Sequence, residues 1–286
     1  MEFIAISLLN GISYGMVLFM LTTGLSLTLG LMGILNLAHG ALYMVAAFVG
    51  WSLATQLGLN WVLALIIGTL TAGLVGLAIE RGFLRHLYKL VDEQALLTIG
   101  FIYILTNISL WIWTGKSRLP YHPGLLSGTF QAAGMEYPIH RIATLAIGTI
   151  LFFGLWWLQE KTRVGAIIRA GMDNREMVTG LGINLGRINY LVFFFSAILV
   201  GFTGVIGSMM MGPRLAMGWD ILLLALIVLV VGGMGSVQGA LLGAMIIGLV
   251  DAFGRALFPD LAMFFMYLVM ILVLVFKPSG LLPRGV

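Results

Sequence analysis

Polar residues interrupt two long apolar stretches of this 286-residue sequence, at corresponding places in its two halves. The interruptions contain Asn36, His39 and Gly40 in the first half and Gly235, Ser236 and Gln238 in the second. A helix broken in this way leaves backbone groups without partners, which a membrane tolerates only where protein or a water-filled cavity satisfies them. Paired breaks mark the binding region of many transporters. These six residues are therefore predicted to lie along a passage for a solute.

Two other roles are open for Asn36 and His39. Buried polar side chains in helix bundles usually hydrogen-bond a neighbour, so both residues could simply bridge two helices. A metal site needs further ligands at suitable spacing, and no second His or carboxylate stands three or four residues from His39. We therefore expect no metal, and the choice between a static helix contact and a solute passage stays open.

A polar segment in the middle of the chain has its own local pattern. Asp173 and Glu176 have capping-box spacing, with Asp in place of Ser or Thr, and predict a short helix beginning near Asn174. Gly182 is suited to end this helix in a left-handed conformation. The helix would carry three apolar residues on one side, namely Met177, Val178 and Leu181. Such a helix fits a groove on a partner protein, and a solvated connector is the alternative.

No set of residues predicts an enzyme. The segment Gly11–Gly15 matches the G-x-S-x-G pattern of hydrolases, but that motif depends on a strand-to-helix turn, and this segment lies in an apolar run. No G-x-x-x-x-G-K-[ST] phosphate loop occurs, so any ATPase must be another chain. With no cysteine, thiol chemistry and disulfides are also excluded.

The composition indicates the elements that position these residues. The chain is 60% hydrophobic and 9% charged, against about a quarter charged residues in soluble domains. Its apolar runs have about the 20 residues that a helix needs to cross a bilayer. We expect one domain, 1–286, that forms an all-α polytopic bundle of eight or nine spans with broken helices. The expected spans are 4–30, 32–54, 61–79, 95–114, 141–158, 189–211, 220–231, 239–251 and 261–276. The sequence leaves open whether 220–251 is one broken span, two spans or a re-entrant pair.

Basic residues indicate the orientation in the membrane. Ten of the 15 fall in three segments and are Arg81, Arg85, Lys89, Lys161, Arg163, Arg169, Arg175, Arg187, Lys277 and Arg284. The positive-inside rule places these segments in the cytoplasm, so 159–188 is a cytoplasmic loop and the proline-rich 115–140 an external loop. Because the basic residues are scattered between apolar spans, nucleic acid is not an expected partner.

Four ordered motifs resemble the branched-chain amino-acid permease family of ABC importers, and more narrowly its high-affinity subunit that pairs with a second homologous permease. The motifs are Asn36–Gly40, the loop Arg163–Asn184, the run Leu229–Gly243 and the tail Lys277–Leu282. The resemblance implies two permease chains in the bacterial inner membrane, two ATP-binding cassette subunits and a periplasmic solute-binding protein. It also implies that ATP and Mg bind those ATPase subunits, while this chain holds no cofactor.

The resemblance further assigns the loop Arg163–Asn184 to coupling with an ATPase. The residues singled out there are Arg163, Gly171, Asp173, Asn174, Glu176, Gly182 and Asn184. The expected function is import of branched-chain or other neutral amino acids, with urea or short amides as the next cargo. An ion-coupled secondary transporter is the third possibility, and it is disfavoured because the spans contain few charged residues to serve as coupling groups.

Overall fold

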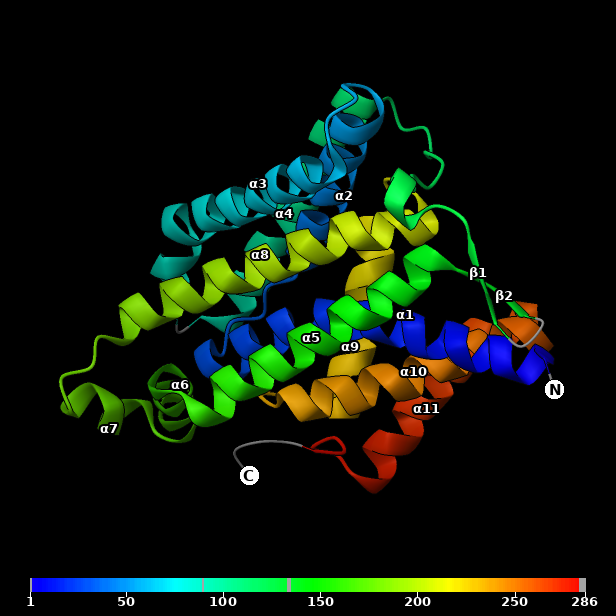
Figure 1. Ribbon diagram of the computed structural model, residues 1–286. Helices are drawn as coiled ribbons and strands as arrows, with labels where there is room; N and C mark the ends of the chain where they lie inside the picture. Colours follow the sequence, from blue (N-terminus) through cyan, green and yellow to red (C-terminus); the bar gives the residue numbers. More distant parts are fainter. Residues whose placement is uncertain (1, 89, 133–134, 283–286) are drawn as a thin grey trace.

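The computed structural model describes residues 2–88, 90–132 and 135–282, and it is predominantly helical (Figure 1). The elements of the first half are α1 (Glu2–Leu27), the π-helical turn η1 (Thr28–Met32), α2 (His39–Thr55), α3 (Trp61–Gly82), η2 (Leu84–Leu87) and α4 (Val91–Trp113). Those between the halves are η3 (Gly124–Leu126), β1 (Thr129–Ala132) and β2 (Met135–Pro138). The second half contains α5 (Ile139–Lys161), α6 (Arg163–Asp173), α7 (Arg175–Gly180), α8 (Leu185–Met211), α9 (Met217–Gly232), α10 (Val237–Leu257), η4 (Pro259–Leu261) and α11 (Ala262–Phe276).

The predicted polytopic helical bundle is confirmed. Seven helices of the described chain are long and apolar enough to cross a membrane. The helices α2 and α9 have 17 and 16 residues, short of the about 20 needed for a full crossing. Both short helices adjoin the predicted breaks, which lie at 33–38 and 233–236.

The second break separates two complete helices. The predicted span 239–251 was too short, because α10 covers 21 residues. The helices α9 and α10 pack antiparallel through glycines: a Cβ atom on Gly239 would lie 2.5 Å from the Gly232 oxygen, and one on Gly243 would lie 2.6 Å from the Val228 oxygen. Only glycine permits backbones to approach this closely.

Two connecting segments contain structure that the sequence did not predict. Within 115–140, β1 and β2 form an antiparallel pair in which Phe130 lies opposite Tyr137. Within 159–188, α5 extends to Lys161, and α6 precedes the predicted short helix. The two segments lie at opposite ends of the molecule, with α6 and α7 far from the strands and the start of α1 (Figure 1).

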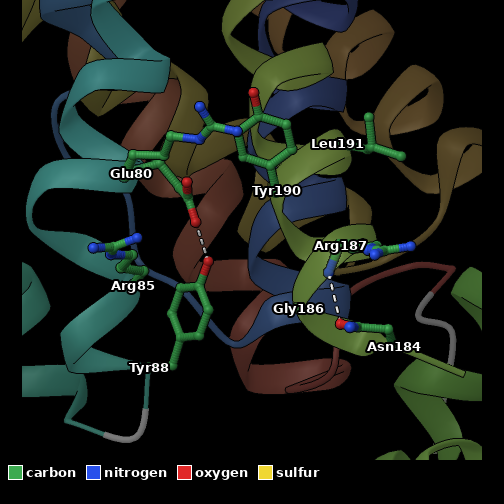
Figure 2. A pocket seen from close by; sticks show the side chains of 9 residues that line it. Glu80, Arg85, Tyr88, Asn184, Gly186, Arg187, Tyr190 and Leu191 are labelled. Atoms are coloured by element: carbon green, nitrogen blue, oxygen red, sulfur yellow. Dashed lines mark hydrogen bonds between the residues drawn. The ribbon is translucent and has the colours of Figure 1, made fainter.

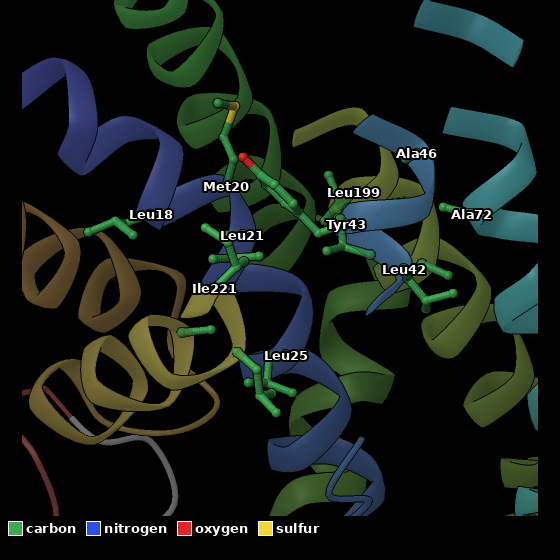
Figure 3. Close-up of a cluster of buried hydrophobic side chains, with 14 of the residues drawn as sticks. Leu18, Met20, Leu21, Leu25, Leu42, Tyr43, Ala46, Ala72, Leu199 and Ile221 are labelled. Carbon is green, nitrogen blue, oxygen red and sulfur yellow. The ribbon is translucent and has the colours of Figure 1, made fainter. Parts of the chain in front are cut away.

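The helix α1 forms the centre of the core. It packs against α5, α8, α9 and α10, while α2 and α3 pack on α8. Leu18, Leu21 and Leu25 of α1 are fully buried in a cluster that includes Leu42 and Tyr43 of α2 (Figure 3). By contrast, α4, α5 and α11 are mostly exposed apolar helices, which suits contact with lipid or another membrane subunit.

Candidate translocation and docking sites

The first break leaves polar atoms buried without partners. Asn36 and His39 are both almost fully buried. The Nε2 atom of His39 lies 2.9 Å from the backbone oxygen of Leu21, and because a carbonyl only accepts, Nε2 carries the proton. Within the described chain, neither Nδ1 of His39 nor Oδ1 of Asn36 has a hydrogen-bond partner. An unpaired buried polar atom costs about 1–3 kcal/mol, and both atoms keep hydrogen-bonding capacity that the described chain does not use.

Thr98 of α4 supports the backbone of this break. Its hydroxyl accepts a hydrogen bond from the Leu37 N–H at 3.2 Å and lies 3.4 Å from the Leu35 oxygen. The left-handed Gly33, at φ +62°, ends the π-helical turn before it. The sequence showed no signal for Thr98, because its partners lie about 60 residues away along the chain.

Gly40 lies in a helix contact. A Cβ atom there would come within 2.0 Å of the Gly218 oxygen, where α2 crosses α9. Any side chain at Gly40 would therefore displace α9. A substitution at this position tests helix packing as much as a passage, so Asn36 is the better residue with which to test solute movement.

Two glycines and two serine side chains fix the backbone of the second break. Gly233 and Gly235 adopt left-handed conformations, with φ +96° and +76°. The Gly235 N–H donates to the Ser26 hydroxyl at 3.0 Å, and Ser236 caps α10 by accepting from the Gly239 N–H at 3.0 Å. Gly235 and Ser236 are buried, whereas Gln238 is exposed on the first turn of α10.

Gln159 clamps this break from α5. Its side-chain nitrogen donates to the Gly235 oxygen at 2.8 Å, and its side-chain oxygen accepts from the Val237 N–H at 3.2 Å. One buried amide thus satisfies a donor and an acceptor that the broken helix leaves free. Sequence reasoning missed Gln159, which stands at the end of an apolar run and is separated from its partners by more than 70 residues.

Both breaks contact the segment formed by the end of α1 and by η1. A Cβ atom on Gly24 would lie 3.2 Å from the His39 ring, and one on Gly30 would lie 2.7 Å from Gly235. Gly24 lies in α1 and Gly30 in η1, so the two breaks contact this continuous segment within about two helical turns of each other. This arrangement supports the sequence-based pairing of the two interruptions.

The segment expected to contact an ATPase contains two helices, α6 and α7. Thr162 caps α6 by accepting from the Gly165 N–H at 3.1 Å, and the guanidinium of Arg169 donates to the backbone oxygen of Gln159. Arg169 also lies 3.7 Å from Glu160. Gly171 is buried on α6, whereas Arg163 is exposed at its start.

The short helix α7 begins at a different cap from the one predicted. Asp173 is the last residue of α6, and Asn174 caps α7 by accepting from the Met177 N–H at 2.9 Å. Asp173 was the wrong cap because α6 extends through it. Glu176 lies in the first turn of α7.

The predicted end of α7 is confirmed, since Gly182 follows it with φ +79°. Asn184 then caps α8 by accepting from the Arg187 N–H at 3.1 Å. The prediction that all three apolar residues of α7 share one side facing a partner was wrong. Val178 is buried, while Met177 and Leu181 are 67% and 72% exposed. Val178 packs inward, and the other two residues remain available to a partner.

Comparison with known proteins shows the family to which this chain belongs. The sequence profile described as the branched-chain amino acid transport system permease component matches residues 7–274. This range includes both breaks and the helices α6 and α7. The chain belongs to this permease family.

Individual members of the family match nearly the whole chain. The high-affinity branched-chain amino acid transport system permease protein BraD of Pseudomonas aeruginosa is 29% identical over 295 residues, covering 97% of this chain and 95% of the relative. The corresponding protein LivH of Escherichia coli K12 is 28% identical, covering 96% and 94%. These relatives are transport permease proteins, and this chain is accordingly a multi-pass membrane protein of the permease type.

A solved structure shares the fold of this permease. A chain of PsaBC from Streptococcus pneumoniae, solved in complex with Fab, superposes with a TM-score of 0.53 over 96% of this chain and 91% of that chain. The sequence identity of 14% limits this likeness to the fold.

A groove of the permease is lined by three arginines, Arg81, Arg85 and Arg187. It has a volume of about 550 Å³, and Figure 2 shows the side chains of α3, η2 and α8 that line it. The hydroxyl of Tyr88 donates to the Glu80 carboxylate, and the Arg81 guanidinium lies 4.5 Å from the centre of the Tyr190 ring. From the sequence, these arginines predicted only the orientation of the chain in the membrane, and no groove. No group of three or more potential metal-ligating side chains gathers anywhere in 2–88, 90–132 and 135–282.

Proposed function

We propose that this chain is one permease subunit of an ATP-driven importer in a bacterial inner membrane, carrying branched-chain or other neutral amino acids. The cargo is supported by the names of BraD and LivH, which are high-affinity branched-chain amino acid transport permease proteins. In this proposal the chain itself is not an enzyme and holds no cofactor. ATP and Mg bind separate ATPase subunits.

The link from α6 to the second break carries the proposal. Arg169 donates to the backbone oxygen of Gln159, and the Gln159 side chain holds Gly235 and Val237. A shift of α6 imposed by an ATPase would therefore reach the broken helix through a single residue. Hydrogen-bonded and packed connections of this kind can carry energetic coupling between two distant sites.

The proposed docking surface consists of α6, α7 and the turn after them. Met177 and Leu181 supply exposed apolar contacts, and Asn174 and Gly182 fix the two ends of α7. Arg163 and Glu176 are exposed and complete the surface, while the buried Gly171 and the cap Asn184 position it. This surface faces the cytoplasm, and the segment 115–140 lies outside.

The proposed passage runs past both breaks. Asn36 and His39 offer unpaired buried polar atoms to a solute or its water. Gly235 and Ser236 follow in the second break, where Gly235 packs against Gly30 of η1. Gly40 shapes the passage by keeping α2 close to α9, and the exposed Gln238 lies directly after the second break. A periplasmic binding protein delivers the solute from outside.

Reconstitution tests this function directly. The chain is assembled with a second permease, two ATPase subunits and the binding protein encoded with it, in sealed vesicles. Uptake of labelled L-leucine that requires both internal ATP and the binding protein is the expected result. Uptake of urea or acetamide but not of leucine would favour the amide cargo. Uptake driven by a proton or sodium gradient without ATP would establish the secondary transporter instead.

A further inference from the structure

A polar cavity lies at the end of the bundle opposite α6 and α7. It has a volume of about 320 Å³, within the usual range of small-molecule sites, and is formed by α1, α5, α8 and α10. The N-terminal half of α1 and the C-terminal end of α10 meet there (Figure 1). The proposed orientation places this cavity on the external side, so a solute would reach it before either break.

One side of the cavity carries a buried carboxylate. Asp251 is only 4% exposed, and the Nε atom of Arg255 lies 2.9 and 2.8 Å from its two oxygens. The Arg255 side chain is 57% exposed, so its terminal N–H groups are not used up by this contact. A buried carboxylate held by one partner retains acceptor capacity for a cation.

A second arginine, Arg141 of α5, also lines the cavity. A terminal nitrogen of Arg141 donates to the Asn10 side-chain oxygen. The Nε atom of Arg141 is buried and has no partner within the described chain. Free N–H groups of an arginine match the two oxygens of a carboxylate, which is the strongest common pairing for such a donor.

The remaining wall is apolar and adaptable. Met210 and Met211 line the cavity from α8, and Ala252 and Ala256 line it from α10. Methionine side chains are flexible and adjust to different aliphatic shapes. The cavity therefore combines donors for a carboxylate, an acceptor for an ammonium group and a wall for an aliphatic side chain.

We propose that this cavity is an outer binding site for a zwitterionic aliphatic α-amino acid, whose carboxylate contacts Arg141 and Arg255 and whose ammonium group contacts Asp251. This inference rests on the proposed import of amino acids. A purely structural ion pair has a different setting in the same chain: Arg214 and Asp220 lie 2.8 Å apart, both 46% exposed, and neither lines the cavity. The buried Asp251 and the two arginines that line the cavity with it offer both signs of charge to a zwitterionic ligand.

Binding of labelled L-leucine to the assembled permease and ATPase complex, without binding protein, tests the site. Arg141→Gln and Asp251→Asn are each expected to weaken binding about tenfold or more, as for loss of a charged hydrogen bond. Asp220→Asn is the matched control and is expected to bind as the wild type does. Leucinamide, which lacks the carboxylate, and 4-methylpentanoate, which lacks the ammonium group, are expected to compete poorly.

Ala252→Phe is a second, independent variant in case the charge variants fail to fold, because it fills the cavity without removing a charge. It is expected to abolish leucine binding while basal ATP hydrolysis per assembled complex is unchanged. Absent binding by the wild type, or unchanged binding by Ala252→Phe and Arg141→Gln, would overturn the site. If the wild-type complex nevertheless imports leucine with its binding protein, only this inference fails. If it imports no amino acid, the proposed function fails as well.

Discussion

The side chain of Gln159 hydrogen-bonds the backbone oxygen of Gly235 at 2.8 Å, joining the end of α5 to the break between α9 and α10. The same glutamine receives Arg169 of α6 at its backbone oxygen. One residue thus contacts both the proposed docking segment and the proposed passage.

Replacing Gln159 with Leu should uncouple ATP hydrolysis from uptake. The change leaves the Gly235 oxygen and the Val237 N–H unpaired, at about 1–3 kcal/mol for each group. We expect a lower melting temperature and fewer leucine molecules imported per ATP. Gln94→Leu is the control, since Gln94 is also buried but its side chain donates to the Leu87 oxygen and bonds neither Gly235 nor Val237. An equal loss of coupling in both variants would remove the special role of Gln159.

Asn36 separates the two explanations of the first break. If its buried oxygen contributes to a passage, Asn36→Leu should reduce uptake at least about tenfold, while assembly with the ATPases and basal hydrolysis persist. Uptake and hydrolysis are measured on the same vesicles and normalised to assembled complex. Thr203→Val, which alters a buried hydroxyl already bonded to the Leu199 oxygen, is expected to import normally. A loss of yield alone in Asn36→Leu would support a static helix contact.

Gly182→Val should disturb the docking segment. At φ +79° a β-branched residue is strained by about 1–3 kcal/mol. We expect ATPase stimulation by the loaded binding protein to fall, while the complex remains assembled. Gly154→Val is the matched control, because Gly154 is helical, lies in α5 outside the proposed docking surface, and a Cβ atom there meets no neighbour within 4 Å. Wild-type stimulation in Gly182→Val would place docking elsewhere.

Single cysteines report the orientation in the membrane. The chain has no cysteine of its own, so every signal comes from the introduced residue. Ser127→Cys should react with a membrane-impermeant maleimide added to intact cells or spheroplasts, whereas Asn174→Cys should react only after the membrane is opened. Both positions are exposed. The reverse pattern would invert the proposed topology and move the ATPase surface to the wrong side.

Local patterns in the sequence predicted the helices and their interruptions. Apolar runs of membrane length must form helices because the bilayer offers no other partner for the backbone. Glycines interrupt these runs at Gly33, Gly233 and Gly235, whose left-handed conformations other residues rarely adopt. The breaks and the turn at Gly182 were therefore visible without any knowledge of packing.

Tertiary structure decided which residues complete each site. Gln159 and Thr98 lie more than 60 residues from the groups they satisfy, so no local pattern connects them. The burial of Val178 and the contact of Gly40 with α9 likewise depend on neighbouring helices. A sequence shows where a backbone must break, because that follows from local conformation. Only the packed bundle shows what satisfies the break, because those hydrogen bonds join segments that meet only in three dimensions.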